Sequence, residues 1–567
     1  MEKYLSKNWL CCGVIGLFTL LLWGRTLGYD FVWDDEILVA QNQSIRSLRN
    51  VPEIFRRLEA QASQTAPSFR PVRTSCYALL YALDGQERPR PRIFHLANVL
   101  WHGAAAMLVF LVAGLLWQRL GGPPGARAAA LLLGLGYAAH PVNSEAVCWI
   151  KCMDDLMAGV FVLAAAWSLL KWEEGKGGYV AALGWFLLAA FSKESAAPFA
   201  VAAFFIFYGF HKLSWGRSVR RTIPFLLLVF FYAAYRHWVM GRTTQYVPLS
   251  GTYGQTLIDM FPVATEYLRL LWGIPPFCAD YNYMVSQPVN PFFSGPVLGG
   301  VCLVLLNCGL AVWLWRKPGW RMAGFGLGWI ALFLLPVSNL LPMMQYMAER
   351  FLYLPLMGFL FALGGVALHW PRPRLAAAAG SALVVLWMSA SFERMGIWKD
   401  DLTLFVRTEL EFPGSQRDEK NAVSAIFHLP QMMALFPDYM KTGSWRMAET
   451  LTPAQAGPVI ATLQEARRLF PENEVFATEL GFTEEKIGRW REAAAMMELA
   501  AGRKPRSAEC WFNLAVARLG AGEAGKAAEA CARALQLKPG YEEARRLQAR
   551  IEDERKAGNA AETPAPK

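Results

Sequence analysis

Residues 9–23 read WLCCGVIGLFTLLLW, and residues 24–36 continue as GRTLGYDFVWDDE. The first stretch contains no charged residue and follows Lys3 and Lys7, which is the charge pattern of a signal peptide. A small-x-small cleavage site does not follow, because the next residues are Gly24-Arg25-Thr26-Leu27. We therefore interpret the run as a retained membrane helix that leads directly into an acidic loop.

The composition of the whole chain supports a membrane protein. Of its 567 residues 54% are hydrophobic and 18% charged, whereas soluble domains carry roughly 25% charged residues. This apolar content also excludes a disordered chain. Residues 1–391 contain 31 Lys+Arg and 19 Asp+Glu, while residues 392–567 contain 25 and 26. The net charge of +11 thus belongs to the apolar part, and the sequence predicts a membrane domain over residues 1–391 followed by a second domain.

Ten further apolar runs predict about eleven membrane spans in an all-α domain. They lie near residues 93–117, 128–140, 156–170, 179–191, 196–210, 223–235, 296–315, 322–340, 350–369 and 375–391. With a cytoplasmic N-terminus, the inner loops hold fifteen basic and three acidic residues, as the positive-inside rule requires. Everything after Ser391 is then extracytoplasmic. Two long stretches fall outside the membrane, the loop at residues 28–92 and an irregular stretch near residues 236–295.

The C-terminal part contains a repeat. Prolines recur every 34 residues, at positions 437, 471, 505 and 539, which is the period of the tetratricopeptide repeat (TPR), a helical hairpin. The best copy covers Ala508 to Tyr541, and small residues at Gly481 and Ala515 would let paired helices approach closely. We expect a linker or degenerate repeat at residues 392–436, a TPR α-solenoid at 437–556 and a flexible tail at 557–567. The solenoid would bind extended polypeptide, or its helices would only pack on their neighbours.

The acidic loop is the first candidate for chemistry. Asp34, Asp35 and Glu36 are consecutive acids beside a membrane boundary. Mutual repulsion and partial desolvation raise a carboxylate pKa towards the range of a general base. The alternative is a solvated acidic loop anchored by Trp33.

Further segments extend the pattern along the chain. They are SFRPV at residues 68–72, FHLANVLWH at 94–102, AAHPVNSEAV at 138–147, FSKES at 191–195, EYLRLLWGIPPFCADYNY at 266–283, LLPVSNLL at 334–341, AERFLYLP at 348–355 and IWKDDLTLF at 397–405. With the acidic loop, this ordered set resembles the C-superfamily (GT-C) glycosyltransferases. It resembles more closely the TMTC-type protein O-mannosyltransferases, which combine transmembrane and TPR regions, and their bacterial relatives.

The resemblance implies a GT-C-like membrane glycosyltransferase. Such an enzyme would move a sugar, by analogy mannose, from a polyprenyl-phosphate donor to Ser/Thr hydroxyls of exported proteins, with inversion and without a metal or cofactor. Asp34 aligns with the base that deprotonates the hydroxyl, and Asp35 with its acidic neighbour. One carboxylate suffices because the lipid phosphate leaves without protonation, in contrast to a glycosidase, which needs two.

Cations are needed to hold the donor phosphate. Lys193 and Arg350 are the candidates, since each is a basic residue at a predicted outer boundary. The alternative is that they pair with their sequence neighbours, Glu194 and Glu349.

Six more polar residues are expected to face the same cavity: His140, Glu145, Glu194, Glu349, Asp154 and Asp155. Relatives commonly carry Gly-Arg-x-Asp before the last of these acids, whereas this chain reads KCMDD at residues 151–155. This departure leaves the position of the acid open between Asp154 and Asp155. Lys151 is the candidate substitute for the missing arginine.

Several function classes lack their signatures. The sequence has no cluster with zinc-ligand spacing and no glycine-rich phosphate loop, so we predict no metal site and no nucleotide-dependent mechanism. The neutral second domain argues against a nucleic-acid partner. The expected partners are the lipid-linked donor, membrane lipid and a polypeptide acceptor. Two alternatives stay open, a transferase acting on lipid or envelope polysaccharide and an inactive TPR membrane scaffold. Animal members of the group that the chain resembles usually carry longer repeat arrays, so by analogy we expect a bacterial inner membrane rather than the endoplasmic reticulum.

Overall fold

In the computed structural model the described residues form helices joined by turns and irregular segments, and they contain no β-strand. The described residues are 8–56, 69–122, 125–173, 178–241, 248–281, 284, 289–412, 416–429, 431–432 and 451–561. The chain divides into two compact units, Met1–Glu419 and Lys420–Lys567. The all-α expectation is therefore confirmed for this part of the chain.

Seven helices of the first unit are long and apolar enough to cross a membrane. They are α1 (Asn8–Trp23), α4 (Pro91–Arg119), α7 (Met153–Lys171), α10 (Trp215–Met240), α12 (Gly295–Arg316), α13 (Arg321–Leu334) and α15 (Pro373–Arg394), some extended by 3-10 turns. Shorter apolar helical segments include α5 (Ala126–Ala139), α8 (Gly178–Ser192), α9 (Phe199–Phe205, within the segment Glu194–Phe210) and α14 (Pro355–Ala367). These helices coincide with the predicted apolar runs, and they make the chain a multi-pass integral membrane protein. The number of eleven spans stays a prediction, because four segments are short for a hydrocarbon layer of about 30 Å.

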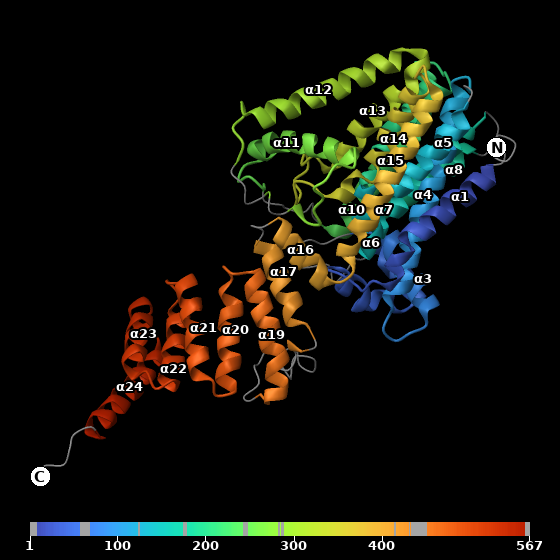
Figure 1. Ribbon diagram of the computed structural model, residues 1–567. Helices are drawn as coiled ribbons and strands as arrows, with labels where there is room; N and C mark the ends of the chain where they lie inside the picture. Colours follow the sequence, from blue (N-terminus) through green and yellow to red (C-terminus); the bar gives the residue numbers. More distant parts are fainter. Residues whose placement is uncertain are drawn as a thin grey trace, which may run out of the picture. The chain divides into compact units, whose positions relative to one another are not determined.

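Helix α7 lies at the centre of this unit. In the apolar window of its span, Ile150–Lys171, 94% of the residues are buried, and the helix packs against α4 and α8 (Figure 1). Helices α13 and α14 approach each other closely through glycine: a Cβ at Gly326 would lie 2.4 Å from the backbone N of Ala362. Dense packing around α7 fixes its N-terminal end, where Asp154 and Asp155 lie.

The two long stretches outside the predicted spans contain helices. The first loop carries α2 (Val51–Arg56) and α3 (Pro71–Asp84). In the second, the prediction of irregular structure is wrong for α11 (Tyr253–Leu271). Thr252 caps this helix by accepting a hydrogen bond from the N–H of Gln255. Polar residues such as Gln255, Asp259 and Glu266 interrupt its apolar residues, so a search for continuous apolar runs does not detect it.

The region between membrane helices and repeats contains α16 (Asp401–Glu411) and α17 (Gln416–Phe427). Five helices follow in chain order and pack successively, α19 (Pro453–Leu469), α20 (Glu474–Lys486), α21 (Trp490–Arg503), α22 (Ala508–Gly520) and α23 (Ala524–Leu537), and α24 (Glu542–Ala561) packs on α23 (Figure 1). Helix α24 includes the first residues of the predicted tail, and residues 562–567 lie outside the described residues.

Helices α20/α21 and α22/α23 form hairpins consistent with the repeat. Pro471, Pro505 and Pro539 fall in the turns between successive hairpins. A Cβ at Gly481 would lie 2.9 Å from the Cε of Met497, so the two helices approach closely at this small residue, as the pattern predicted. Pro437 lies outside the described residues, and assignment of the hairpins to the TPR class stays a prediction.

Candidate active site

The two neighbouring aspartates of the first loop have different environments. The side chain of Asp35 is fully buried, and its carboxylate accepts backbone N–H groups from Lys151 at 2.8 Å and from Val32 at 3.3 Å. Burial raises the pKa of the Asp35 carboxyl well above its usual range. Asp34 instead leaves 41% of its side chain exposed, and its Oδ2 lies 3.2 Å from the Nζ of Lys151. Asp35 therefore ties the loop to the start of α7, while Asp34 stays accessible.

Lys151 precedes α7, and it contacts Asp34 of the acidic loop as well as Trp149 and Arg73. Its ammonium lies 4.3 Å from the ring centroid of Trp149 in addition to pairing with Asp34. Its carbonyl accepts a hydrogen bond from Arg73, whose guanidinium also lies 3.6 Å from Asp154. The candidate substitute for an arginine is thus bonded to the acidic loop through its side chain and its backbone.

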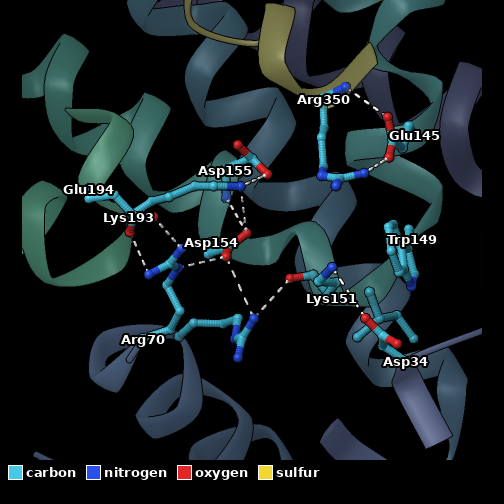
Figure 2. Close-up of polar contacts among 12 residues, drawn as sticks. Asp34, Arg70, Glu145, Trp149, Lys151, Asp154, Asp155, Lys193, Glu194 and Arg350 are labelled. Atoms are coloured by element: carbon cyan, nitrogen blue, oxygen red, sulfur yellow. Dashed lines mark hydrogen bonds and ion pairs between the residues drawn. The ribbon is translucent and has the colours of Figure 1, made fainter. Parts of the chain in front are cut away.

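Lys193 lies at the C-terminal end of α8, and it faces the first turn of α7. Its Nζ pairs with Asp155 and lies 3.5 Å from Oδ1 of Asp154 (Figure 2). Both acids left open by the KCMDD segment therefore contact one cation. Asp154 also accepts from Arg70, at 3.2 Å.

Arg350 lies in a short 3-10 turn just before α14. Its guanidinium pairs with Glu145, and its backbone N–H donates to the same carboxylate at 2.8 Å (Figure 2). A second branch of the guanidinium donates to Gln345 at 2.6 Å, and its central carbon lies 5.4 Å from the Trp149 ring centroid. Glu145 is fully buried, so this ion pair is held away from solvent.

The acids adjacent in sequence have other partners. Glu194 lies 2.5 Å from Arg70, and Glu349 lies 2.8 Å from Arg394. The alternative that Lys193 and Arg350 pair with these sequence neighbours is therefore wrong. Adjacent side chains diverge at these 3-10 turns, so the partners come from distant segments.

Lys193 and Arg350 line the same small, open hollow. One part of its lining is polar and one part is apolar: it comprises Asp155, Lys193, Ser195, Arg350, Phe333, Val337, Phe351 and Leu354. Both predicted phosphate ligands and one predicted cavity acid, Asp155, thus line this hollow. A second predicted cavity acid, Glu145, pairs with Arg350.

His140 and Glu349 lie elsewhere. The Nε2 of His140 is 3.0 Å from the carbonyl of Leu271, its Nδ1 accepts from the Val142 N–H, and its ring packs 4.3 Å from Trp387. Glu349 is fully buried in its pair with Arg394. Neither residue is among those that line the hollow described above. Their contacts are those of residues that hold the fold together.

Three arginines with structural contacts were not predicted. Arg70 bridges Asp154 and Glu194, Arg73 contacts Asp154, and Arg394 pairs with Glu349. Arg70 stands within the SFRPV segment, directly before Pro71 at the start of α3. These arginines could have been predicted to form ion pairs, because a charged side chain in or near a membrane usually requires a partner of opposite charge.

Metal ligation finds no support in the described residues. Among them no group of three or more His, Cys, Asp or Glu side chains gathers in a way that could hold a metal ion. The metal-independent reaction stays a prediction.

In the described residues, fold and site together define an all-helical, multi-pass membrane protein with a buried cluster of paired charges and a partly exposed aspartate, Asp34, beside it. No protein-family model matches the chain. Comparison with curated proteins gives distant but consistent homology to TMTC protein O-mannosyltransferases, over up to 69% of the chain. The resemblance to this group is therefore confirmed.

Three relatives show the extent of the match. The mouse Protein O-mannosyl-transferase TMTC4 is 23% identical over 456 residues, which are 69% of this chain and 60% of that protein. The Caenorhabditis elegans Protein O-mannosyl-transferase F38B6.6 is 24% identical over 393 residues, with 67% and 54% covered. The Xenopus laevis Protein O-mannosyl-transferase tmtc2 is 28% identical over 226 residues, with 38% and 26% covered. The chain thus spans 60% or less of the length of these relatives.

Proposed function

We propose that this protein is an inverting membrane glycosyltransferase that moves a sugar, mannose by analogy with its relatives, from a polyprenyl-phosphate donor to Ser/Thr hydroxyls of exported proteins. The observation that carries this proposal is that the charged cluster holds a partly exposed carboxylate and, separately, two cations that line a hollow. The carboxylate of Asp34 is partly exposed and pairs with the ammonium of Lys151. Two other cations, Lys193 and Arg350, line a hollow that is partly apolar.

Asp34 is the proposed base. Its carboxylate takes the proton of the acceptor hydroxyl while the hydroxyl oxygen attacks the anomeric carbon of the sugar. The bond between that carbon and the phosphate oxygen breaks, and the lipid phosphate leaves with the electron pair. Attack from the face opposite the phosphate inverts the anomeric configuration. The burial of Asp35 and its two backbone hydrogen bonds make it the loop anchor, which supports Asp34 rather than Asp35 as the base.

Lys193 and Arg350 are the proposed ligands of the donor phosphate. A cation near the phosphate stabilises the negative charge that grows on the leaving oxygen. Both cations already pair with acids, Lys193 with Asp155 and Arg350 with Glu145, so the phosphate would share them. Phe333 and Leu354 give the hollow an apolar side next to the two cations.

The second unit has a proposed role in acceptor binding. Its successive hairpins would present a concave TPR surface to an extended polypeptide. This role requires the orientation inferred from the basic inner loops, with a cytoplasmic N-terminus and the repeats on the periplasmic or lumenal side. Membrane lipid and the lipid-linked donor are the other proposed partners.

The test is transfer of labelled mannose from polyprenyl-phosphate-mannose to exported proteins, with purified protein in lipid. Asp34→Asn should lower kcat at least about 100-fold, because general base catalysis contributes roughly 10²–10⁴-fold. Asp30→Asn is the matched control, since Asp30 is an exposed acid of the same loop and should retain wild-type activity. Equal transfer by wild type and Asp34→Asn would contradict the proposed base. Label incorporated into lipid alone would indicate a different acceptor.

A further inference from the structure

The chain segment that follows α15, residues 399–405, contacts the acidic loop. The backbone N–H of Asp30 donates to the carbonyl of Lys399 at 3.0 Å. The backbone N–H of Trp33 donates to Oδ1 of Asp401 at 2.7 Å. The ring of Phe405 lies edge-on to Trp33, with 5.5 Å between their centroids. Three contacts from residues 399–405 thus converge on the residues just before Asp34.

Trp33 has an unusual backbone conformation. Its φ is +56°, in the left-handed region that bulky L-residues rarely adopt. Such a conformation persists only where the surroundings hold it. Here the Trp33 ring stacks on Trp149 with centroids 4.7 Å apart and planes 13° from parallel, and Asp401 binds the backbone N–H of the same residue.

The backbone at Trp33 determines where Asp34 points. Because the two residues share a peptide unit, a change at Trp33 would redirect the Asp34 carboxylate away from Lys151. The ring stack restrains the Trp33 side chain, but a ring can stay stacked while its backbone rotates. The hydrogen bond from the Trp33 N–H to Asp401 acts directly on the backbone.

We propose that Asp401 is a positioning residue for Asp34: through its hydrogen bond to the Trp33 N–H it holds the loop in the conformation that presents the Asp34 carboxylate. This inference rests on the proposed function of Asp34 as base. It assigns a role in the reaction to the segment that follows the membrane helices. Asp401 itself is not a catalytic residue.

Three variants separate this role from general stability. Asp401→Ala removes the acceptor of the Trp33 N–H, whereas Asp401→Asn keeps an oxygen at that position. Asp400→Ala is the matched control. The side chain of Asp400 accepts from the N–H of Thr403 at 2.8 Å and caps α16, so its loss weakens the same helix without touching Trp33.

The first measurement is mannose transfer from polyprenyl-phosphate-mannose by the full chain in lipid. Asp401→Ala should lower kcat about 10- to 100-fold, since small displacements of a catalytic group have effects of that size. The KM for the donor should stay within about twofold, because the phosphate ligands are separate residues. Asp401→Asn should recover most of kcat, and Asp400→Ala should stay near wild type.

The second measurement is hydrogen exchange of peptides covering residues 29–36, which does not depend on enzymatic activity. Asp401→Ala should speed exchange there at least about tenfold, and Asp401→Asn and Asp400→Ala should not. Unchanged exchange in Asp401→Ala would overturn the inference, as would an unchanged kcat or an equal loss in Asp400→Ala. A wild-type protein that transfers no sugar would remove the proposed function, and the exchange data alone would then decide whether Asp401 holds the loop.

Discussion

The ammonium of Lys151 lies 3.2 Å from the carboxylate of Asp34. The backbone N–H of the same lysine binds Asp35, so one residue at the start of α7 orients both acids of the first loop. This contact joins segments more than a hundred residues apart in the chain. It places the carboxylate of Asp34 beside the Lys151 ammonium, and it gives the buried carboxylate of Asp35 a backbone N–H as hydrogen-bond donor.

Removing the Lys151 charge should slow sugar transfer. In Lys151→Met the Asp34 carboxylate loses its partner and its fixed orientation, and we expect kcat to fall about tenfold, equivalent to about 1.4 kcal/mol. Lys151→Arg keeps a cation at this site and should restore much of the rate. Steady-state kinetics of the three proteins checks this expectation, and a wild-type kcat in Lys151→Met would contradict it.

Asp35 should matter for stability more than its neighbour does. Asp35→Ala leaves the N–H groups of Val32 and Lys151 without their acceptor in a buried place, and this should cost about 1–3 kcal/mol. Asp34→Ala, at an exposed position, should change stability by less than about 1 kcal/mol. Thermal melting of the purified proteins in detergent provides the comparison. Equal melting temperatures for the two variants would disagree with the anchor role of Asp35.

The buried pair of Glu349 and Arg394 should respond differently to single and double substitution. Arg394→Met alone leaves a buried carboxylate without its cation, and we expect a loss of about 3–5 kcal/mol. Adding Glu349→Gln removes that carboxylate charge and should recover a large part of the loss. The measurement is again thermal melting, and a double variant less stable than Arg394→Met would refute this account.

Glu479 in α20 should make the second unit sensitive to pH. Burial raises the pKa of its carboxyl from 4.5 to about 7, and its Oε2 has no hydrogen-bond partner among the residues that the structure describes. A raised pKa in the folded state means that the protonated form favours folding, so its contribution to stability is present below pH 4.5 and is lost as the pH rises through about 7. Glu479→Gln should therefore stabilise α20 by about 1–3 kcal/mol at pH 8 and hardly at all at pH 4.5.

Hydrogen exchange of α20 peptides in the full chain at the two pH values tests the Glu479 prediction. Glu529→Gln, at an exposed position of α23, is the control and should have no effect at either pH. A stabilisation by Glu479→Gln that is the same at both pH values would show that the carboxyl does not titrate between them.

The orientation in the membrane can be tested with reporter fusions. A fusion after Ser391 should report an extracytoplasmic location, and one after Arg119 a cytoplasmic location, because the basic loops are predicted on the inner face. A cytoplasmic signal from the fusion after Ser391 would reverse the predicted side of the repeats.

Features that depend on neighbouring residues could be predicted from the sequence. The apolar runs such as residues 9–23 and 296–315 predicted helices because a membrane span is a property of length and local composition. The 34-residue spacing of Pro471, Pro505 and Pro539 predicted the turns between hairpins for the same reason. Helix α11 was missed because polar residues interrupt its apolar residues, so it contains no continuous apolar run.

Partners and exposure of the charged groups were decided by the tertiary structure. The sequence alone identified Asp34, Asp35, Lys193 and Arg350 as candidates, but burial separated Asp34 from Asp35, and Arg350 paired with Glu145, which is 205 residues away. Ion pairing depends on distances of a few ångströms between side chains from different helices, and local sequence carries no record of those distances. For the same reason the sequence of the first loop could not predict the contact with Asp401, which accepts a hydrogen bond from the N–H of Trp33, the residue next to the proposed base.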